Sequence, residues 1–152
     1  MIKISIQQEV FDVSSEINSM SSKTIGAIAT FSGIVRDSSE SSSLISLTLE
    51  HYPGMSEAAL EKIANAAKRE WSLEAVRIIH RVGRLLPEDT IVFVGCASAH
   101  RQAAFDGCRF IMDFLKTDAP FWKSEETQEG SFWISEREKD KKASESWLLK
   151  NT

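Results

Sequence analysis

The stretch Thr90-Ile-Val-Phe-Val-Gly-Cys-Ala97, which runs directly into Ser98-Ala-His-Arg101, decides the fold of this chain. A short and almost uninterrupted apolar run of this kind predicts a strand buried in the middle of a sheet. The residues after it predict a helix over 99–116, with Ser98 as its N-cap. Apolar residues recur along this helix at the spacing of one buried face, namely Ala104, Cys108, Ile111 and Leu115.

Further strands and helices are predicted on both sides of this stretch. The strands are expected over 2–6, 25–35, 44–52, 75–82 and 131–136. The helices are expected over 14–21, from an N-cap at Ser56 to about Trp71, and over 139–149, and the first has Ser14 or Ser15 as its cap. This order indicates an α+β fold, a single domain over residues 1–152 with helices packed on a mixed or antiparallel sheet.

Several short segments interrupt the regular pattern. Gly26 and Gly33 mark a close backbone approach or a bulge within their strand. Residues 37–43 contain no apolar side chain, so we expect a mobile loop there. Pro87-Glu88-Asp89 predicts a turn, and the aromatic segment Pro120-Phe121-Trp122-Lys123 is expected to form a loop.

The composition excludes several classes of protein. Of the 152 residues, 42% are apolar and 26% are charged, as in an ordinary globular protein, and the net charge is −4. A general nucleic-acid binder needs a basic surface, so this class is not supported. No apolar run approaches the roughly 20 residues that a transmembrane helix needs.

The cysteines and histidines predict neither a disulfide framework nor a metal site. Cys96 and Cys108 lack CxxC spacing, and the three histidines are scattered along the chain. We therefore expect free thiols, no metal and no cofactor. The start of the chain alternates like a strand and lacks the apolar core of a signal peptide, so the protein is expected in the cytoplasm.

The start of the helix after the central strand is unusual in its charge. A helix N-terminus carries a partial positive charge and prefers acidic residues, yet His100 and Arg101 stand there. A bound anion such as a phosphate would compensate these cations and use the free backbone N–H groups. The alternative is a packed histidine beside a surface arginine, and the sequence alone does not choose between them.

Two lysines follow at the end of this helix and just beyond it. Lys116 is also explained by the helix dipole alone, which favours a cation at a C-terminus. Lys123 follows two aromatic residues and a proline, a setting that can favour proton transfer but that also occurs where a loop covers a core edge. Arg36 ends a strand and Arg137 lies among charges, so either can be a surface residue. His51 and His80 are interpreted as structural histidines.

At these positions the sequence resembles the family of molybdopterin synthase large, or catalytic, subunits. The resemblance lies in an ordered set of segments that covers most of residues 25–140: 47–55, 79–83, 91–95, 98–101, 110–117 and 119–123. The segment from Leu115 to Lys123, Leu-Lys-Thr-Asp-Ala-Pro-Phe-Trp-Lys, is the most specific of them.

The resemblance implies an α/β-hammerhead-like fold and a sulfurtransferase activity in molybdenum cofactor biosynthesis. A homodimer would form the centre of a heterotetramer with a small ubiquitin-like sulfur-carrier subunit at each end. Sulfur would pass from that subunit's C-terminal Gly-Gly thiocarboxylate to cyclic pyranopterin monophosphate and form the dithiolene of molybdopterin.

The resemblance also assigns residues to this reaction. Lys116 and Lys123 match the catalytic lysines, which would stabilise an oxyanion, donate a proton or attack the acyl group. The substrate-binding positions that match are Ile34, Val35, Arg36, His100, Arg101, Lys116, Lys123, Ser124, Glu125 and, with a weaker match, Arg137. Any contact from Ile34 is expected through its backbone, and Asp118 is expected to face solvent, away from the lysines.

Two rival functions remain open at this point. One is a scaffold that keeps the binding sites but does not turn over, and the lysine pair argues against it. The other is an unrelated enzyme of phosphorylated metabolites. The sequence contains no phosphate-cradling glycine loop, so this second rival has little support.

Overall fold

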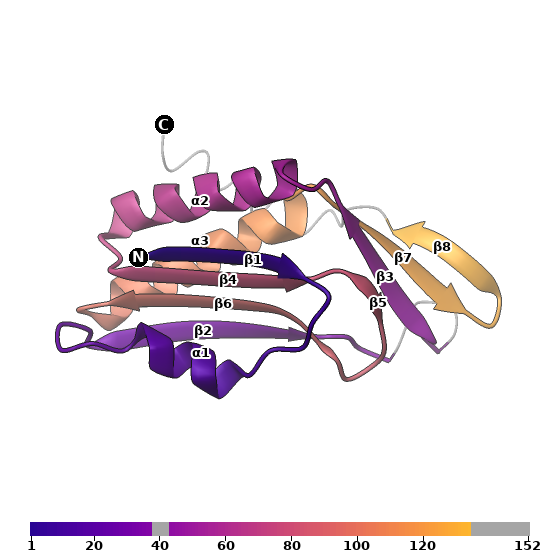
Figure 1. Ribbon diagram of the computed structural model, residues 1–152, viewed down its shortest axis with the longest axis horizontal. Helices are drawn as coiled ribbons and strands as arrows, with labels where there is room; N and C mark the ends of the chain where they lie inside the picture. The colour runs from indigo at the N-terminus through magenta and orange to yellow at the C-terminus, as the bar shows by residue number, and fades with distance from the viewer. Residues whose placement is uncertain (38–42, 135–152) are drawn as a thin grey trace.

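The structure is a computed structural model, and it describes residues 1–37 and 43–134 (Figure 1). Its elements follow one another along the chain as β1 (Ile2–Gln7), α1 (Val13–Met20), β2 (Ala27–Ile34), β3 (Ser46–His51), α2 (Met55–Trp71), β4 (Ala75–Arg81), β5 (Gly83–Leu85), β6 (Thr90–Ser98), α3 (Arg101–Thr117), β7 (Phe121–Thr127) and β8 (Gly130–Ile134). The predicted α+β class is confirmed. The predicted helix over 139–149, Arg137, and most of the loop 37–43 lie outside the described residues.

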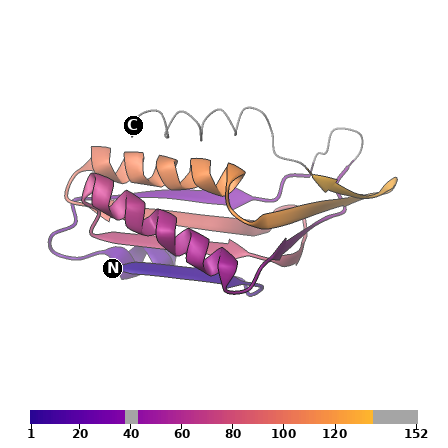
Figure 2. The same ribbon diagram turned by 90° about the horizontal axis from the view of Figure 1, so that it is seen from above.

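The first sheet has the strand order β1-β4-β6-β2. The apolar strand β6 lies inside it and pairs antiparallel with both β4 and β2, whereas β1 is parallel to β4. The prediction of a buried central strand is therefore confirmed. Figures 1 and 2 show α2 and α3 side by side along one face of this sheet, and α1 lies on the other face.

The main core lies between the sheet and the helices α2 and α3. Each helix contributes one apolar stripe to it: Leu60, Ala64 and Ala67 from α2, and Ala104, Cys108 and Ile111 from α3. The predicted inward face of α3 is confirmed, and Leu115 also packs against this cluster. Because α3 is held along its whole length, both of its ends have fixed positions relative to the sheet.

Gly26, just before β2, and Gly33 within β2 occupy positions where a side chain would not fit. A Cβ at Gly26 would lie 2.1 Å from the Ala99 carbonyl oxygen, and one at Gly33 would lie 2.5 Å from Val92 Cγ1. The register of β2 against β6 also shifts between Gly33 and Ile34. Both expectations, a close approach and a bulge, are confirmed.

The second sheet has the strand order β5-β3-β7-β8 and projects beyond the first (Figure 1). The prediction of a loop at residues 120–123 is wrong after Pro120, because Phe121 begins β7 and pairs with His51 of β3. The short strand β5 was not predicted either. Both strands form because neighbouring strands, distant in sequence, supply their hydrogen-bond partners, and neither has a run of apolar residues of its own.

All three predicted helix caps are wrong by two residues or more. Asp12 caps α1 and accepts a hydrogen bond from the Ser14 backbone N–H at 3.0 Å. Gly54 and His100 hold the N-cap positions of α2 and α3. Ser56 is instead buried, where its hydroxyl donates to the Pro120 carbonyl at 3.0 Å and so ties α2 to the segment before β7.

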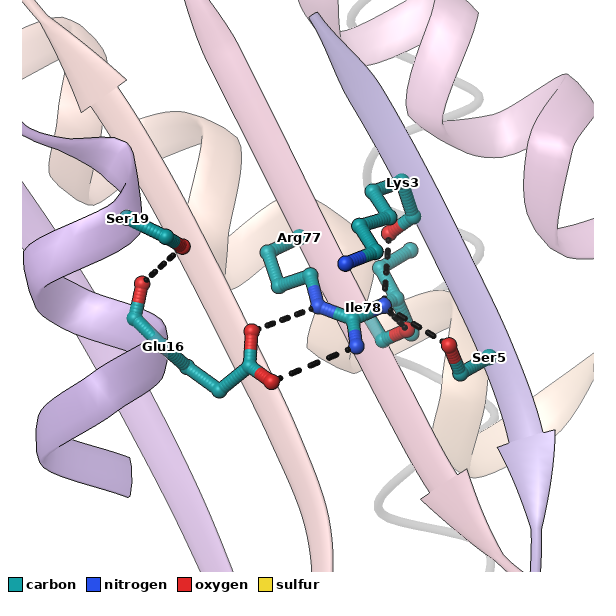
Figure 3. A network of polar contacts seen from close by, with 6 residues as sticks. All are labelled: Lys3, Ser5, Glu16, Ser19, Arg77 and Ile78. Atoms are coloured by element: carbon teal, nitrogen blue, oxygen red, sulfur yellow. Dashed lines mark hydrogen bonds and ion pairs between the residues drawn. The ribbon is translucent and has the colours of Figure 1, made fainter. Parts of the chain in front are cut away.

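A buried ion pair fixes α1 to the face of the sheet opposite α2 and α3 (Figure 3). The side chain of Arg77 on β4 donates from Nε to Glu16 of α1 at 2.8 Å and from a terminal nitrogen to the Ser5 hydroxyl at 2.9 Å. Arg77 is only 4% exposed. This network holds α1, β1 and β4 together on the face of the sheet opposite α3 (Figure 1).

Within the described part of the chain, no helix is long and apolar enough to cross a membrane.

Candidate active site

Lys116 and Lys123 lie at the same end of the molecule because a tight connection joins α3 to β7. The helix ends where the Asp118 backbone N–H donates to the Phe114 carbonyl at 2.8 Å, and the Phe121 N–H donates to Ala119 at 2.8 Å. Lys116 is exposed in the last turn of α3, and Lys123 is half-buried on β7. Asp118 is exposed, as expected.

His80 lies between these lysines and the core, and it is the most unusual titratable group at this end. It continues the alternation of Val76 and Ile78 on β4, whose side chains lie in the main core. It is only 6% exposed, and its ring stacks on Phe121 with centroids 4.1 Å apart and an interplanar angle of 15°. Burial, together with the charges of Lys123 and Lys116, lowers the pKa of His80 to about 4.

His51 reaches the other side of Phe121. It pairs with Phe121 across β3 and β7, and its ring centroid lies 6.5 Å from that of Phe121. Its Nε2 lies 3.3 Å from Glu57 Oε1 at the start of α2. The interpretation of His51 as a hydrogen-bonded histidine agrees with this contact.

The sequence did not predict that His51, His80 and Phe121 lie together beside the lysines. One signal was present in the sequence, because His80 falls on the inward face of an alternating strand near the end of that strand. Burying a polar side chain there is unfavourable unless a hydrogen bond or a ring contact compensates for it. The stack itself joins β4 to β7, and no local pattern reports such a contact.

Arg36 lies at this same end of the first sheet. Ile34 at the end of β2 pairs with Thr90, and His80 pairs with Val92 two residues further along β6. Arg36 and Ile34 are both exposed. Val35 between them is buried, and both of its backbone groups are used, since its N–H donates to Asp89 and its carbonyl accepts from Glu88, each at 2.8 Å. Val35 therefore fixes the strand end, and its buried side chain is not available to a ligand.

Ser124 and Glu125 follow Lys123 on β7 and point to opposite faces of the second sheet. Successive side chains of a strand alternate, so Glu125 shares the face of Lys123 whereas Ser124 shares the face of Trp122. The neighbouring strand β8 adds three exposed apolar side chains, Phe132, Trp133 and Ile134. Ile134 pairs directly with Lys123.

His100 and Arg101 lie at the opposite end of α3 from Lys116, so one chain does not bring all of these cations together. At a rise of about 1.5 Å per residue, the backbones of Arg101 and Lys116 are about 22 Å apart. Both residues of the helix start are exposed, and no acidic residue occupies the first turn of α3. One chain thus forms two separate basic regions: Lys116, Lys123 and Arg36 at one end, His100 and Arg101 at the other.

The lysine end has the chemistry to stabilise negative charge. Two primary amines lie beside a neutral buried imidazole and aromatic walls, and such a setting strengthens an ionic interaction compared with open water. Among the residues described, no three His, Cys, Asp or Glu side chains are placed to hold a metal ion. Cys96 and Cys108 are free and buried in the core.

Comparisons with known proteins agree on one family. The family described as "MoaE protein" matches residues 6–118. The molybdopterin synthase catalytic subunit of Pseudomonas aeruginosa is 51% identical over 146 residues, which cover 95% of this chain and 97% of that protein.

Solved structures show the same likeness. The molybdopterin biosynthesis MoaE protein of Burkholderia ambifaria has a TM-score of 0.83 and 48% identity, and the match covers 97% of this chain and 98% of that one. A complex of subunits 1 and 2 of molybdopterin-converting factor from Helicobacter pylori contains a chain with the same fold, at a TM-score of 0.72 and 21% identity, covering 90% of this chain and 91% of that one.

Proposed function

The chain belongs to the MoaE protein family, and on that premise we propose that it is the catalytic subunit of a molybdopterin synthase. In this reaction sulfur passes from the C-terminal thiocarboxylate of a small ubiquitin-like subunit to cyclic pyranopterin monophosphate. Two such deliveries form the dithiolene. The observation that carries the proposal is the placement of Lys116 and Lys123 around the stacked pair of His80 and Phe121.

The lysines have a role in each transfer. When the sulfur has bonded to the pterin, the partner is released by attack of water on its acyl carbon, which places negative charge on the acyl oxygen. The carbon–sulfur bond then breaks, so the partner leaves as a carboxylate and the sulfur stays on the pterin as a thiolate. An ammonium group at the acyl oxygen lowers the barrier, and the same group can donate a proton to a departing oxygen of the pterin phosphate. A neutral lysine attacking the acyl carbon is the covalent alternative.

We propose further that His100 and Arg101 act in the site of a second copy of the chain. They would bind the pterin phosphate together with Arg36, a role that needs exposed cations and free helix N–H groups. Because they lie about 22 Å from the lysines of their own chain, a shared site between two copies is the arrangement that brings all these cations to one ligand.

The flank formed by β2 and α3 is suited to that second copy. β2 is an edge strand, and three large apolar side chains are exposed on this flank: Phe31, Ile34 and Phe105, of which Phe105 is 64% exposed. β2 starts beside Ser98 and ends beside Thr90. A two-fold axis perpendicular to β2 therefore places the His100 end of one copy beside the Arg36 end of the other.

The small subunit is proposed to dock on the second sheet. β8 is an edge strand next to Lys123, and its exposed Phe132, Trp133 and Ile134 can bury apolar surface of a partner. An extended C-terminal tail leaving that partner would pass along the face of Lys123. The cytoplasm remains the proposed compartment, in line with the two free thiols.

A reconstitution tests this function. The chain is mixed with a thiocarboxylated ubiquitin-like partner and cyclic pyranopterin monophosphate, and molybdopterin is measured by mass spectrometry. The matched control uses the same partner with an ordinary C-terminal carboxylate. Product in the first mixture alone supports the proposal, and its absence from both mixtures contradicts it.

A further inference from the structure

The protonation state of His80 follows from its contacts. Its Nδ1 lies 2.9 Å from the Arg81 carbonyl oxygen, which can only accept a hydrogen bond. Nδ1 must therefore carry the proton. Because burial keeps the ring neutral at physiological pH, Nε2 has no proton and is a hydrogen-bond acceptor.

The stack on Phe121 fixes where this acceptor lies. With the rings 4.1 Å apart and nearly parallel, His80 cannot rotate without losing both the stack and the bond to Arg81. Its neighbours in the sheet are apolar, namely Ile6 on β1 and Val92 on β6. The acceptor is thus held rigidly within an otherwise apolar wall.

Basic side chains from three further elements lie near His80. Lys123 on β7 has the largest electrostatic effect on it, followed by Lys116 on α3 and then by His51 on β3, whose own partner is Glu57 on α2. His80 is thus the neutral acceptor among these basic groups. Lys123 lies two residues after Phe121 on β7, so both side chains share one face of that strand, and Phe121 stacks on His80. A buried acceptor beside an ammonium group is well suited to orient it.

We propose that His80 is a positioning residue, whose Nε2 accepts a hydrogen bond from the Lys123 ammonium and so holds that group where the acyl group of the partner enters the site. The inference rests on the proposed function and deepens it. An amine held in this way stays protonated, so Lys123 acts through its charge or its proton and does not attack the acyl carbon.

Three substitutions separate the acceptor from the ring. His80→Asn keeps a donor for the Arg81 carbonyl but loses the acceptor at the Nε2 position. His80→Gln places an amide oxygen close to that position and is the conservative control. His80→Phe keeps the stacked ring without either nitrogen, and it replaces the Asn variant if that variant does not fold.

Two readouts are needed, and one of them does not depend on turnover. The first is the rate at which Lys123 is acylated by acetic anhydride, relative to the exposed Lys62 on α2 in the same sample. The second is kcat and KM for sulfur transfer. Loss of the acceptor frees the amine, so His80→Asn is expected to speed Lys123 acylation by about threefold and to lower kcat about tenfold at an unchanged KM. His80→Gln should stay near the wild type in both.

Unchanged acylation of Lys123 in the Asn variant would overturn the inference. Equal losses in the Asn and Gln variants, in proportion to a lower folded fraction, would also overturn it, because they indicate packing alone. If the wild-type chain makes no molybdopterin while the acylation rates change as expected, the proposed function fails and the contact between His80 and Lys123 stands.

Discussion

The lowered pKa of His80 makes the stability of the folded chain depend on pH. The pKa is lowered to about 4 in the folded chain, by burial first, from an ordinary value near 6.5. Between these two pH values His80 binds a proton in the unfolded chain but not in the folded chain. The full contribution of His80 to the free energy of unfolding is therefore present above about pH 6.5, and it is lost as the pH falls towards 4.

The expected loss is about 1.4 kcal/mol for each pH unit in this window. Urea unfolding at pH 7 and pH 4.5 measures it, with His80→Gln as the comparison, since other groups titrate equally in both proteins. A wild-type chain that loses no more stability than the Gln variant would show that His80 takes up its proton in the folded state.

Lys116 is the second residue with a direct test. Its side chain is exposed in the last turn of α3, so Lys116→Ala should leave the fold intact and should still bind the pterin and the small subunit. Product formation should fall by about 10² or more, as for removal of a group that stabilises transition-state charge. Lys62→Ala on α2 is the charge-matched control. Normal product yield from the Lys116 variant would refute the assignment.

At the level of single residues, the sequence could indicate which side chains carry unusual charge but not what surrounds them. The cations at the start of α3 are visible in the sequence because they conflict with the preference of the helix dipole, and Lys123 is visible because it follows two aromatic residues and a proline. Lys116 agrees with the helix dipole, so only the family resemblance singles it out. The buried state of His80 is not visible, because it depends on Phe121, which lies 41 positions away on a strand that the sequence did not predict.

The first sheet and the two helices packed on it were predictable because these elements have their own repeating pattern of apolar residues. β6, α2 and α3 have apolar patterns long enough to identify them without knowledge of their neighbours. β5 and β7 are short or polar and form through pairing with β3, so their signal lies in the partner strand. The predictions of the helix caps failed for a related reason. A serine near a helix start can form its hydrogen bond with a distant segment, as Ser56 does with the Pro120 carbonyl.

The attachment of α1 gives a prediction at the scale of elements. Glu16→Ala would leave Arg77 buried without its counter-charge, which typically costs about 3 kcal/mol. Urea unfolding should show this loss, and hydrogen exchange should show α1 opening first. Glu70→Ala on the exposed face of α2 is the control. Because the network lies on the face of the sheet opposite α3, kcat of the folded fraction should not change, and a kcat loss without a stability loss would contradict this separation.

At the scale of the whole molecule, α3 is a spacer between two basic regions. Lys116 and Arg101 are assigned to one site but lie far apart within one chain, and the proposed symmetry that would bring them together cannot be inferred from the sequence of a single chain. The exposed Phe105 on the flank of α3 and β2 is the feature that supports the proposed second copy.

Phe105→Arg should therefore weaken self-association. Placing a charge in the centre of an apolar contact opposes burial, so analytical ultracentrifugation should show a shift from dimer to monomer. Sulfur transfer should fall with it at low protein concentration, because each site would lose its second basic region. If Phe105→Arg dimerises with unchanged affinity, the two copies do not make contact through this flank.

Complementation between two inactive variants tests the shared site most directly. Lys116→Ala and Arg101→Ala are each expected to be poorly active at low pterin concentration. Mixed as unfolded chains and refolded together, half of the dimers are mixed, and one of the two sites in each mixed dimer combines an intact Lys116 with an intact Arg101 of the other copy. The account predicts that roughly a quarter of the wild-type activity returns on mixing. Activity that stays at the average of the two separate variants would contradict it.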